Sequence, residues 1–210
     1  MEIIDYIFGQ YKEYSTLHIV LEILTVICSI VSVIFSARNS VLVYPFGILG
    51  TGIYVYLLFQ WELPGDMIIN AYYFIMSLYG WYNWSSDLGE EAIPVTRVSQ
   101  EQWLQSLMIF LGAVIGVYVV YQLLGMLSSY LNYIDIFTTG IFFVGMWQMA
   151  LRKLEHWLVL LVGNIITIPL YFIKGYSFSA ILYIFLAYMA YVGFVEWKKH
   201  HLRRNLVASE

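Results

Sequence analysis

Charge is scarce in this chain. Only 11% of its 210 residues are Asp, Glu, Lys or Arg, and 61% are hydrophobic, whereas a soluble domain is about 25% charged. This balance excludes a water-soluble globule and a disordered chain. The net charge of −4 offers no basic face for nucleic acid. The single cysteine, Cys28, excludes a disulfide framework. We therefore expect an all-α membrane protein.

Signatures of several membrane-protein classes are also missing. The last apolar stretch, 178–197, contains no lysine for a retinal Schiff base, and the chain contains no H-E-x-x-H metalloprotease motif. The four histidines have no metal-ligand spacing. No soluble region is large enough for a nucleotide-binding domain, and the acidic N-terminus is unlike a cleavable signal peptide. We expect neither an enzyme nor a bound metal or cofactor.

Seven apolar stretches are each long enough to cross a hydrocarbon core of roughly 30 Å, which takes about 20 helical residues. They cover approximately residues 17–37, 41–60, 66–83, 103–126, 133–151, 157–173 and 178–197. Lys and Arg are divided unequally between the two sides. One side carries Lys12 and Lys174, and the other carries Arg38, Arg97, Arg152, Lys153, Lys198, Lys199, Arg203 and Arg204. The positive-inside rule then predicts the N-terminus outside and the C-terminus inside.

An internal repeat appears when the chain is shifted by 113 residues, which aligns 22–84 with 135–197 without a gap. Identical pairs include Ala37/Ala150, Gly50/Gly163, Gly80/Gly193 and Trp84/Trp197. Three spans end on the side opposite their start, so one further span must return the chain before the second triplet. This predicts two parallel three-helix repeats and a linker helix, which is one plan of secondary transporters. The alternative is a duplication kept for packing alone.

The expected organisation follows from these spans. It comprises an extracytoplasmic segment 1–16, a first repeat 17–84, a cytoplasmic loop 85–102, a linker helix 103–126, a second repeat 133–197 and a basic tail 198–210. Gly112 and Gly116 in the linker helix could serve packing within the chain or pair subunits of a homo-oligomer.

Polar residues inside the spans are functional candidates, because hydrocarbon offers them no partner. Asn70 and Tyr73 lie on one stripe of the third span, and Asn70 serves either another helix or a ligand. The sixth span places five residues on one stripe: Trp157, Leu160, Asn164, Thr167 and Tyr171. A tryptophan face about two turns from an amide suits a planar heteroaromatic ligand.

Further residues complete the hypothetical site and its moving parts. Tyr183 and Tyr188 of the seventh span either line the pocket or pack in the core. Gly50, Gly163 and Pro169 mark places where spans could bend or slide. Glu22 and Asp135 occupy equivalent repeat positions, and could bond helix ends of their own repeat, attract a cation or carry a proton. Glu155 is expected to pair locally with Arg152 and Lys153.

The chain resembles the PnuC family of bacterial vitamin transporters over roughly residues 17–197. The resemblance is carried by YGWYNW (79–84), RKLEHW (152–157), Asn164 and YFIKG (171–175). It implies facilitated diffusion of an unphosphorylated vitamin across the bacterial inner membrane, with trapping by a cytoplasmic kinase. Small-molecule substrate and membrane lipid are then the partners.

Two positions depart from the family members that carry nicotinamide riboside. These have a W-x-x-W pair in the sixth span and a glutamine in the third, where this chain has Leu160 and Asn70. Because a lost ring face reshapes the pocket without adding charge, we expect thiamine as substrate. Nicotinamide riboside is the first alternative, followed by riboflavin or a deoxynucleoside. A non-transporting receptor or scaffold and an ion-coupled transporter are more distant alternatives.

Overall fold

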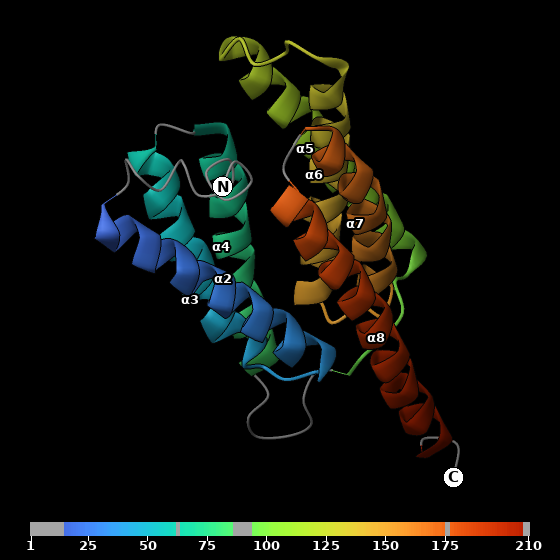
Figure 1. Ribbon diagram of the computed structural model, residues 1–210. Coiled ribbons are helices and arrows are strands. Elements are labelled where there is room, and N and C mark those ends of the chain that lie inside the picture. Colours follow the sequence, from blue (N-terminus) through green and yellow to red (C-terminus); the bar gives the residue numbers. More distant parts are fainter. Residues whose placement is uncertain (1–14, 62–63, 86–93, 175–176, 208–210) are drawn as a thin grey trace.

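The computed structural model describes residues 15–61, 64–85, 94–174 and 177–207. Within these ranges the chain forms seven α-helices (Figure 1). They are α2 (Thr16–Ala37), α3 (Val43–Gln60), α4 (Pro64–Ser85), α5 (Gln100–Leu123), α6 (Tyr130–Ala150), α7 (His156–Ile173) and α8 (Ser177–Val207). The predicted all-α fold is confirmed. Most of the predicted segment 1–16, the middle of the loop 85–102 and the end of the tail 198–210 lie outside the described residues.

Five of these helices have the length and apolar composition needed to cross a membrane, namely α2, α3, α5, α7 and α8. The other two, α4 and α6, do not reach this mean hydropathy and pack against each other. Polar helices are costly against lipid. The two least apolar helices of the bundle therefore shield one another.

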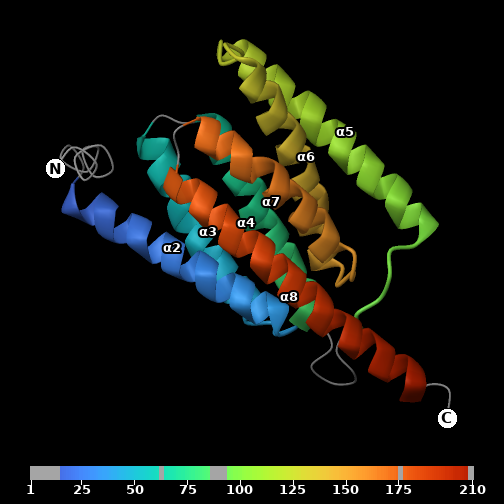
Figure 2. The same cartoon turned by 45° about the vertical axis from the view of Figure 1, so that its right-hand side comes forward.

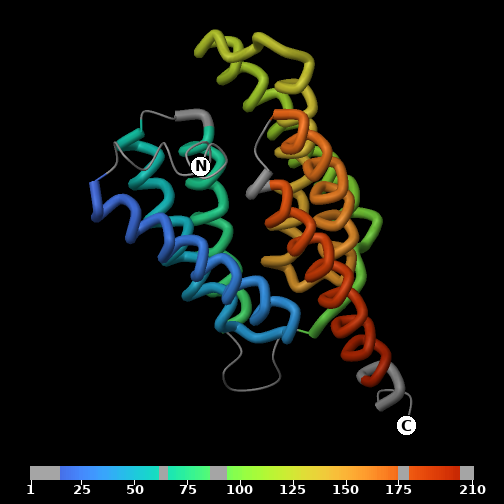
Figure 3. The backbone as a smooth tube through the Cα atoms, in the orientation of Figure 1, coloured from blue at the N-terminus to red at the C-terminus, as the bar shows by residue number. Residues whose placement is uncertain are grey.

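The helices form two groups of three. Helices α2, α3 and α4 pack together in chain order, as do α6, α7 and α8. We call these groups the first and second triplets. Helix α5 lies along the outer side of α6 and barely touches the first triplet (Figure 2). Each helix of the first triplet runs in the same direction as its counterpart in the second (Figure 3). This is the predicted arrangement of two parallel triplets and a linker helix.

Residues 113 apart make the same local contacts. The turn after α2 is closed by a bond from Arg38 N–H to the Ile34 carbonyl, and the turn after α6 by one from Leu151 N–H to the Trp147 carbonyl, both 3.2 Å long. Asn39 and Arg152, the next residues, have positive φ angles of 56° and 55°. The side-chain hydroxyls of Thr25 and Thr138 bond the carbonyls of Glu22 and Asp135. The repeat is therefore visible in backbone geometry.

Glycines bring the first two helices of each triplet together. A Cβ placed on Gly50 would stand 3.1 Å from Cβ of Cys28, and one on Gly163 would stand 3.2 Å from Ile141 and closer still to Phe142. Cys28 and Ile141 are equivalent positions. By contrast, Gly112 and Gly116 of α5 have no described atom within 4 Å of such a Cβ. The described part of the chain therefore does not use that pair for close helix packing.

The two ends of the bundle differ in charge. The end where α2, α4 and α6 finish carries Arg38, Arg97, Arg152, Lys153, Lys198, Lys199 and Arg203, and we call it the basic end. The opposite end carries Glu22, Asp66, Asp135 and Lys174, and we call it the acidic end. The two triplets approach one another at the basic end (Figure 1).

Candidate substrate site

Helices α4 and α6 contact each other through stacked aromatic rings. Tyr72 of α4 stacks on Phe143 of α6, with ring centroids 3.8 Å apart and 6° between the planes. The Tyr72 hydroxyl donates a 2.9 Å hydrogen bond to the Phe143 carbonyl. This contact fixes α4 against α6 in the middle of the bundle, between the two triplets.

A group of three tyrosines lies beside this contact, and we call Tyr73, Tyr171 and Tyr183 the tyrosine cluster. The Tyr171 and Tyr183 rings meet edge to face, 5.1 Å apart, and their hydroxyls are hydrogen-bonded. The Tyr73 ring meets those of Tyr72 and Phe143 edge to face, each with ring centroids 6.1 Å apart. Tyr171 and Tyr183 therefore join α7 to α8, and Tyr183 also lies 6.0 Å from Phe142 of α6. That Tyr73 and Tyr183 close a substrate pocket stays a prediction.

One stripe of α7 faces inward from the acidic end to the middle of the bundle. It carries Asn164, Thr167 and Tyr171 at helical spacing. The Thr167 hydroxyl bonds the Gly163 carbonyl of its own helix. The Asn164 side chain is 5% exposed and forms no hydrogen bond with any described residue. Because neither hydrocarbon nor a described residue offers this amide a hydrogen bond, Asn164 is a candidate to bond a ligand.

The acidic end closes with an ion pair. The Lys174 ammonium, at the C-cap of α7, contacts the Asp135 carboxylate of α6, and the side chains are 19% and 18% exposed. Asp66, in the first turn of α4, is exposed at this end. Asp135 thus pairs with the side chain of a lysine in its own repeat, a partner that we did not predict.

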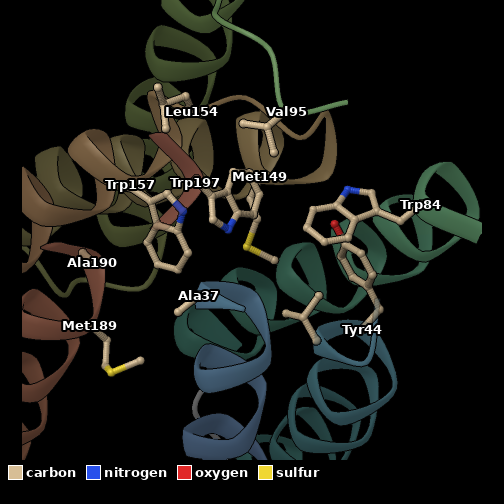
Figure 4. Close-up of a cluster of buried hydrophobic side chains, with 11 residues drawn as sticks. Ala37, Tyr44, Trp84, Val95, Met149, Leu154, Trp157, Met189, Ala190 and Trp197 are labelled. Atoms are coloured by element: carbon tan, nitrogen blue, oxygen red, sulfur yellow. The ribbon is translucent and has the colours of Figure 1, made fainter. Parts of the chain in front are cut away.

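The basic end is closed by an aromatic group from both triplets, Tyr44, Trp84, Trp157 and Trp197, which we call the aromatic plug (Figure 4). Tyr44 meets Trp84 edge to face at 5.0 Å, and their equivalents Trp157 and Trp197 meet likewise at 5.8 Å. The Trp84 and Trp197 indoles donate to the carbonyls of Ala150 and Ser36, each at the end of the other triplet's first helix.

Trp157 is therefore enclosed by protein in this structure. It is 1% exposed, it packs on Gly193 of α8, and its ring lies 4.4 Å from that of His156. Three polar atoms in this region are buried without a partner in the described part of the chain: Tyr44 Oη, His156 Nε2 and Trp157 Nε1. The predicted stacking residue lies within the plug and away from the tyrosine cluster.

Residues 94–99 hold the basic end from outside, and we call this segment the strap. Thr96 exchanges backbone bonds with Arg152 and Leu154 in the turn between α6 and α7. The Lys153 ammonium donates to Thr96 Oγ1 at 2.8 Å, and burial lowers its pKa while the Glu155 charge opposes the shift. Val95 is buried against the plug.

Glu155 belongs to the strap and does not pair with its neighbours. Its carboxylate accepts a 2.9 Å bond from Val98 N–H and lies 3.8 Å from Arg97. The expected local ion pair with Arg152 and Lys153 is wrong. A glutamate pointing to a loop about 57 residues earlier in the chain could not be recognised from spacing along one helix.

Several predicted residues do not join the tyrosine cluster. Asn70 donates to the Asp66 carbonyl of its own helix at 2.9 Å. Leu160 packs against Gly145 of α6. Tyr188 is 63% exposed on the outer face of α8, so it does not line a site inside this chain. Helix α7 continues through Pro169.

Other residues of the site were not among the predictions. Tyr72, Phe143, Tyr171 and Lys174 all contribute to the interface or its acidic end. Helical spacing placed Tyr171 on the predicted α7 stripe without a ligand role, and Lys174, one turn further on, could have been identified in the same way. Tyr44 could have been found from the repeat, because it aligns with Trp157.

A groove of about 650 Å³ lies elsewhere, between α4, α5 and α6 near the basic end. Its lining includes Tyr79, Gln105, Met108 and Trp147. Met108 is 57% exposed, and Tyr79 is also on the outer surface. A groove open along the outside of a membrane bundle faces lipid, so it is not the substrate site.

The interface offers ring faces and one amide that no described residue bonds, which suit a planar polar molecule. Among the described residues, no three His, Cys, Asp or Glu side chains are grouped to hold a metal ion.

The family model described as "Nicotinamide mononucleotide transporter" matches residues 19–199. The nicotinamide riboside transporter PnuC of Neisseria mucosa is 26% identical over 186 residues, covering 82% of this chain and 70% of that protein. The riboflavin/roseoflavin transporter RibM of Streptomyces davaonensis is 25% identical over 175 residues, covering 81% of each.

A solved structure has the same fold. The crystal structure of the vitamin B3 transporter PnuC superimposes with a TM-score of 0.66 at 24% identity, covering 96% of this chain and 88% of that one. The relatives are transporters and not enzymes. With its two triplets, its polar central interface and a family match over residues 19–199, the chain belongs to the PnuC family of membrane transporters.

Proposed function

We propose that this protein is a facilitator that moves unphosphorylated nicotinamide riboside across the bacterial inner membrane. The observation that carries the proposal is the buried, unpartnered Asn164 on a stripe that continues into the tyrosine cluster. The nicotinamide ring would lie against Tyr73 and Tyr183, with its carboxamide or ribose hydroxyls bonded to Asn164.

The comparisons support nicotinamide riboside better than thiamine, which the sequence alone favoured. Two arguments for thiamine were Leu160 and Asn70, and both side chains contact their own triplet or helix in this structure. Riboflavin is the second candidate, because RibM is nearly as similar as the Neisseria mucosa relative.

The closed basic end supports an alternating-access mechanism. The aromatic plug and the strap block passage at that end, so the substrate would reach the tyrosine cluster from the acidic end. Opening would separate the triplets at the plug and release the substrate beside Trp157. By the positive-inside rule the basic end, with the C-terminus, faces the cytoplasm. A cytoplasmic kinase that phosphorylates the vitamin would then make uptake one-way.

The first test is ligand binding by the purified protein in detergent, followed by tryptophan fluorescence. Nicotinamide riboside, riboflavin, thiamine and nicotinamide mononucleotide are titrated separately. We expect nicotinamide riboside to bind most tightly. Asn164→Leu should weaken its binding at least about fivefold, because a buried hydrogen bond is lost. Tyr188→Phe, on the outer face of α8, is the matched control and should bind normally.

Flux into liposomes distinguishes a transporter from a receptor. Uptake should proceed without any ion gradient and stop when inner and outer concentrations are equal. Binding without flux would identify a receptor, and a requirement for a gradient would identify an ion-coupled carrier. Tight binding of thiamine alone, or an unchanged affinity in Asn164→Leu, would contradict the proposed substrate or the proposed site.

A further inference from the structure

The groove between α4, α5 and α6 on the outside of the bundle has walls from both triplets and from the linker helix. It exists because α5 packs along α6 and barely touches the first triplet, which leaves space beside α4 (Figure 2). Its volume is about 650 Å³, and pockets of about 300–1,000 Å³ are large enough to hold a ligand. The groove is therefore a candidate site that the transport mechanism does not use.

Polar side chains line the groove at the basic end of the bundle. They are Gln102 and Gln105 of α5, Tyr79 of α4 and Trp147 of α6. Counted from the ends of their helices, none of them lies more than about 9 Å into the bundle. Helix α5 has 24 residues and is about 36 Å long, which exceeds the roughly 30 Å of hydrocarbon. The first turns of α5 therefore lie at the level of the lipid headgroups.

These four side chains carry hydrogen-bond donors that the described part of the chain leaves unused. Gln102 Oε1 accepts a 3.0 Å bond from Ser99 N–H, but the amide nitrogen of Gln102 donates to no described residue. The Gln105 amide, the Tyr79 hydroxyl and Trp147 Nε1 make no hydrogen bond with the described residues either. Because polar groups at the edge of the hydrocarbon gain from a partner, four donors in one groove favour a ligand rich in acceptors.

The groove becomes apolar further into the membrane. Met108 and Ile109, one turn beyond Gln105 on α5, line this part. Met108 is 57% exposed, so a hydrocarbon chain lying in the groove would cover it. A matching ligand therefore has acceptor oxygens at the basic end and a hydrocarbon chain that points toward the middle of the membrane.

We propose that the groove is a binding site for one glycerophospholipid from the leaflet at the basic end. The phosphate and ester oxygens of this lipid accept hydrogen bonds from the four donors, and one acyl chain lies along Met108 and Ile109. Arg97, whose side chain is 70% exposed, precedes the N-cap residue of α5 by two positions and adds positive charge at the level of the phosphate. The lipid thereby joins α5 to the first triplet. This site is independent of which vitamin the protein carries.

Retention of phospholipid through purification tests the site. The protein is washed with lipid-free maltoside detergent and measured by native mass spectrometry, and we expect about one phospholipid per wild-type chain. Met108→Trp fills the apolar part of the groove and should reduce retention at least about fivefold. Leu107→Trp is the matched control, because Leu107 is 52% exposed on the same turn of α5 and does not line the groove. This control should retain the wild-type amount.

A second pair of variants tests the polar part. Delipidated protein is titrated with phosphatidylglycerol, and Gln105→Leu should need about fivefold more lipid for half occupancy, because one hydrogen bond is lost. Gln122→Leu makes the same chemical change at the exposed far end of α5 and should bind like wild type. Thermal unfolding shows that each variant is folded, and added lipid should raise the wild-type midpoint, since it binds the native state.

Three results would overturn the proposal. Folded wild-type protein could neither retain nor rebind phospholipid. Both tryptophan variants could lose lipid equally, which would mean that lipid forms only a general layer around the bundle. The wild type could also be an oligomer that Met108→Trp converts to monomers, in which case a second copy of the chain covers the groove in place of a lipid.

Discussion

Arg152 of the second triplet holds Asn39 of the first. The guanidinium Nε donates a 2.8 Å hydrogen bond to Asn39 Oδ1, and Nη2 donates to the Asn39 carbonyl at 3.3 Å. The same guanidinium lies 4.4 Å above the Trp84 ring. The two residues stand 113 apart, at equivalent turns with the same positive φ. The two triplets therefore contact each other through a pair of equivalent residues.

Two substitutions of Asn39 distinguish the contribution of its hydrogen bond to Arg152 from that of its positive φ angle. Asn39→Gly removes the hydrogen bond to a buried charge and should cost about 1.5–3 kcal/mol. Asn39→Ala should be worse by about 1 kcal/mol or more, because alanine resists a positive φ. Thermal unfolding in detergent, followed by tryptophan fluorescence, measures both. Equal stability of the two variants would mean that the backbone conformation at Asn39 is not under strain.

Two tyrosine-to-phenylalanine changes should shift stability in opposite directions. Tyr44 Oη is buried without a partner among the described residues, so Tyr44→Phe should raise the unfolding midpoint. The Tyr72 hydroxyl bonds the Phe143 carbonyl, so Tyr72→Phe should lower it, by about 1 kcal/mol. Because Tyr44→Phe favours the closed plug, it should also slow uptake. A destabilised Tyr44→Phe variant would show that its hydroxyl has a partner.

Gly193 packs against the aromatic plug and should not tolerate a larger side chain. The Cβ of Gly193→Ala would overlap the Trp157 ring. We expect a loss of about 1–3 kcal/mol from overpacking, with weaker substrate binding if Trp157 is displaced. Gly112→Ala, which has open space around its Cβ, is the control and should be neutral or slightly stabilising. A fully stable Gly193→Ala variant would show that the plug is loosely packed.

The Glu155 carboxylate is one of the groups that hold the strap. Glu155→Gln weakens the bond to Val98 N–H, so we expect the strap to detach more often and to be cleaved faster by added protease. Glu196→Gln removes a partner of Lys199 on the exposed part of α8 and should leave the cleavage rate unchanged. Equal cleavage of wild type and Glu155→Gln would mean that Thr96 and Lys153 hold the strap without Glu155.

The fold could be predicted from the sequence because long apolar stretches and a repeat leave little choice. Gly80 and Gly193 recur at the same register since each makes room for a ring, Tyr44 in one triplet and Trp157 in the other. Hydropathy and spacing are sufficient to detect both features.

The site was predicted less completely. Most of these helices are apolar on every side, so the pattern does not tell which face meets another helix and which meets lipid. Tyr188 was therefore predicted for the pocket and lies outside it, whereas Tyr72 was overlooked beside Tyr73. Asn70 bonds a carbonyl four residues earlier in its own helix, a solution that an amide in a membrane helix always has available.

The Trp84 indole donates to a carbonyl of the second triplet, and the Trp197 indole donates to a carbonyl of the first. This reciprocal arrangement has an evolutionary meaning. Each tryptophan completes the helix end of the other triplet, as two identical chains do across a two-fold axis. An ancestral three-helix protein that paired with a second copy in the same orientation would make these contacts without any linker. Fusion of the two copies would then require α5 only to carry the chain back across the membrane. Once joined, the copies could diverge, so that a tyrosine now stands where its counterpart is Trp157.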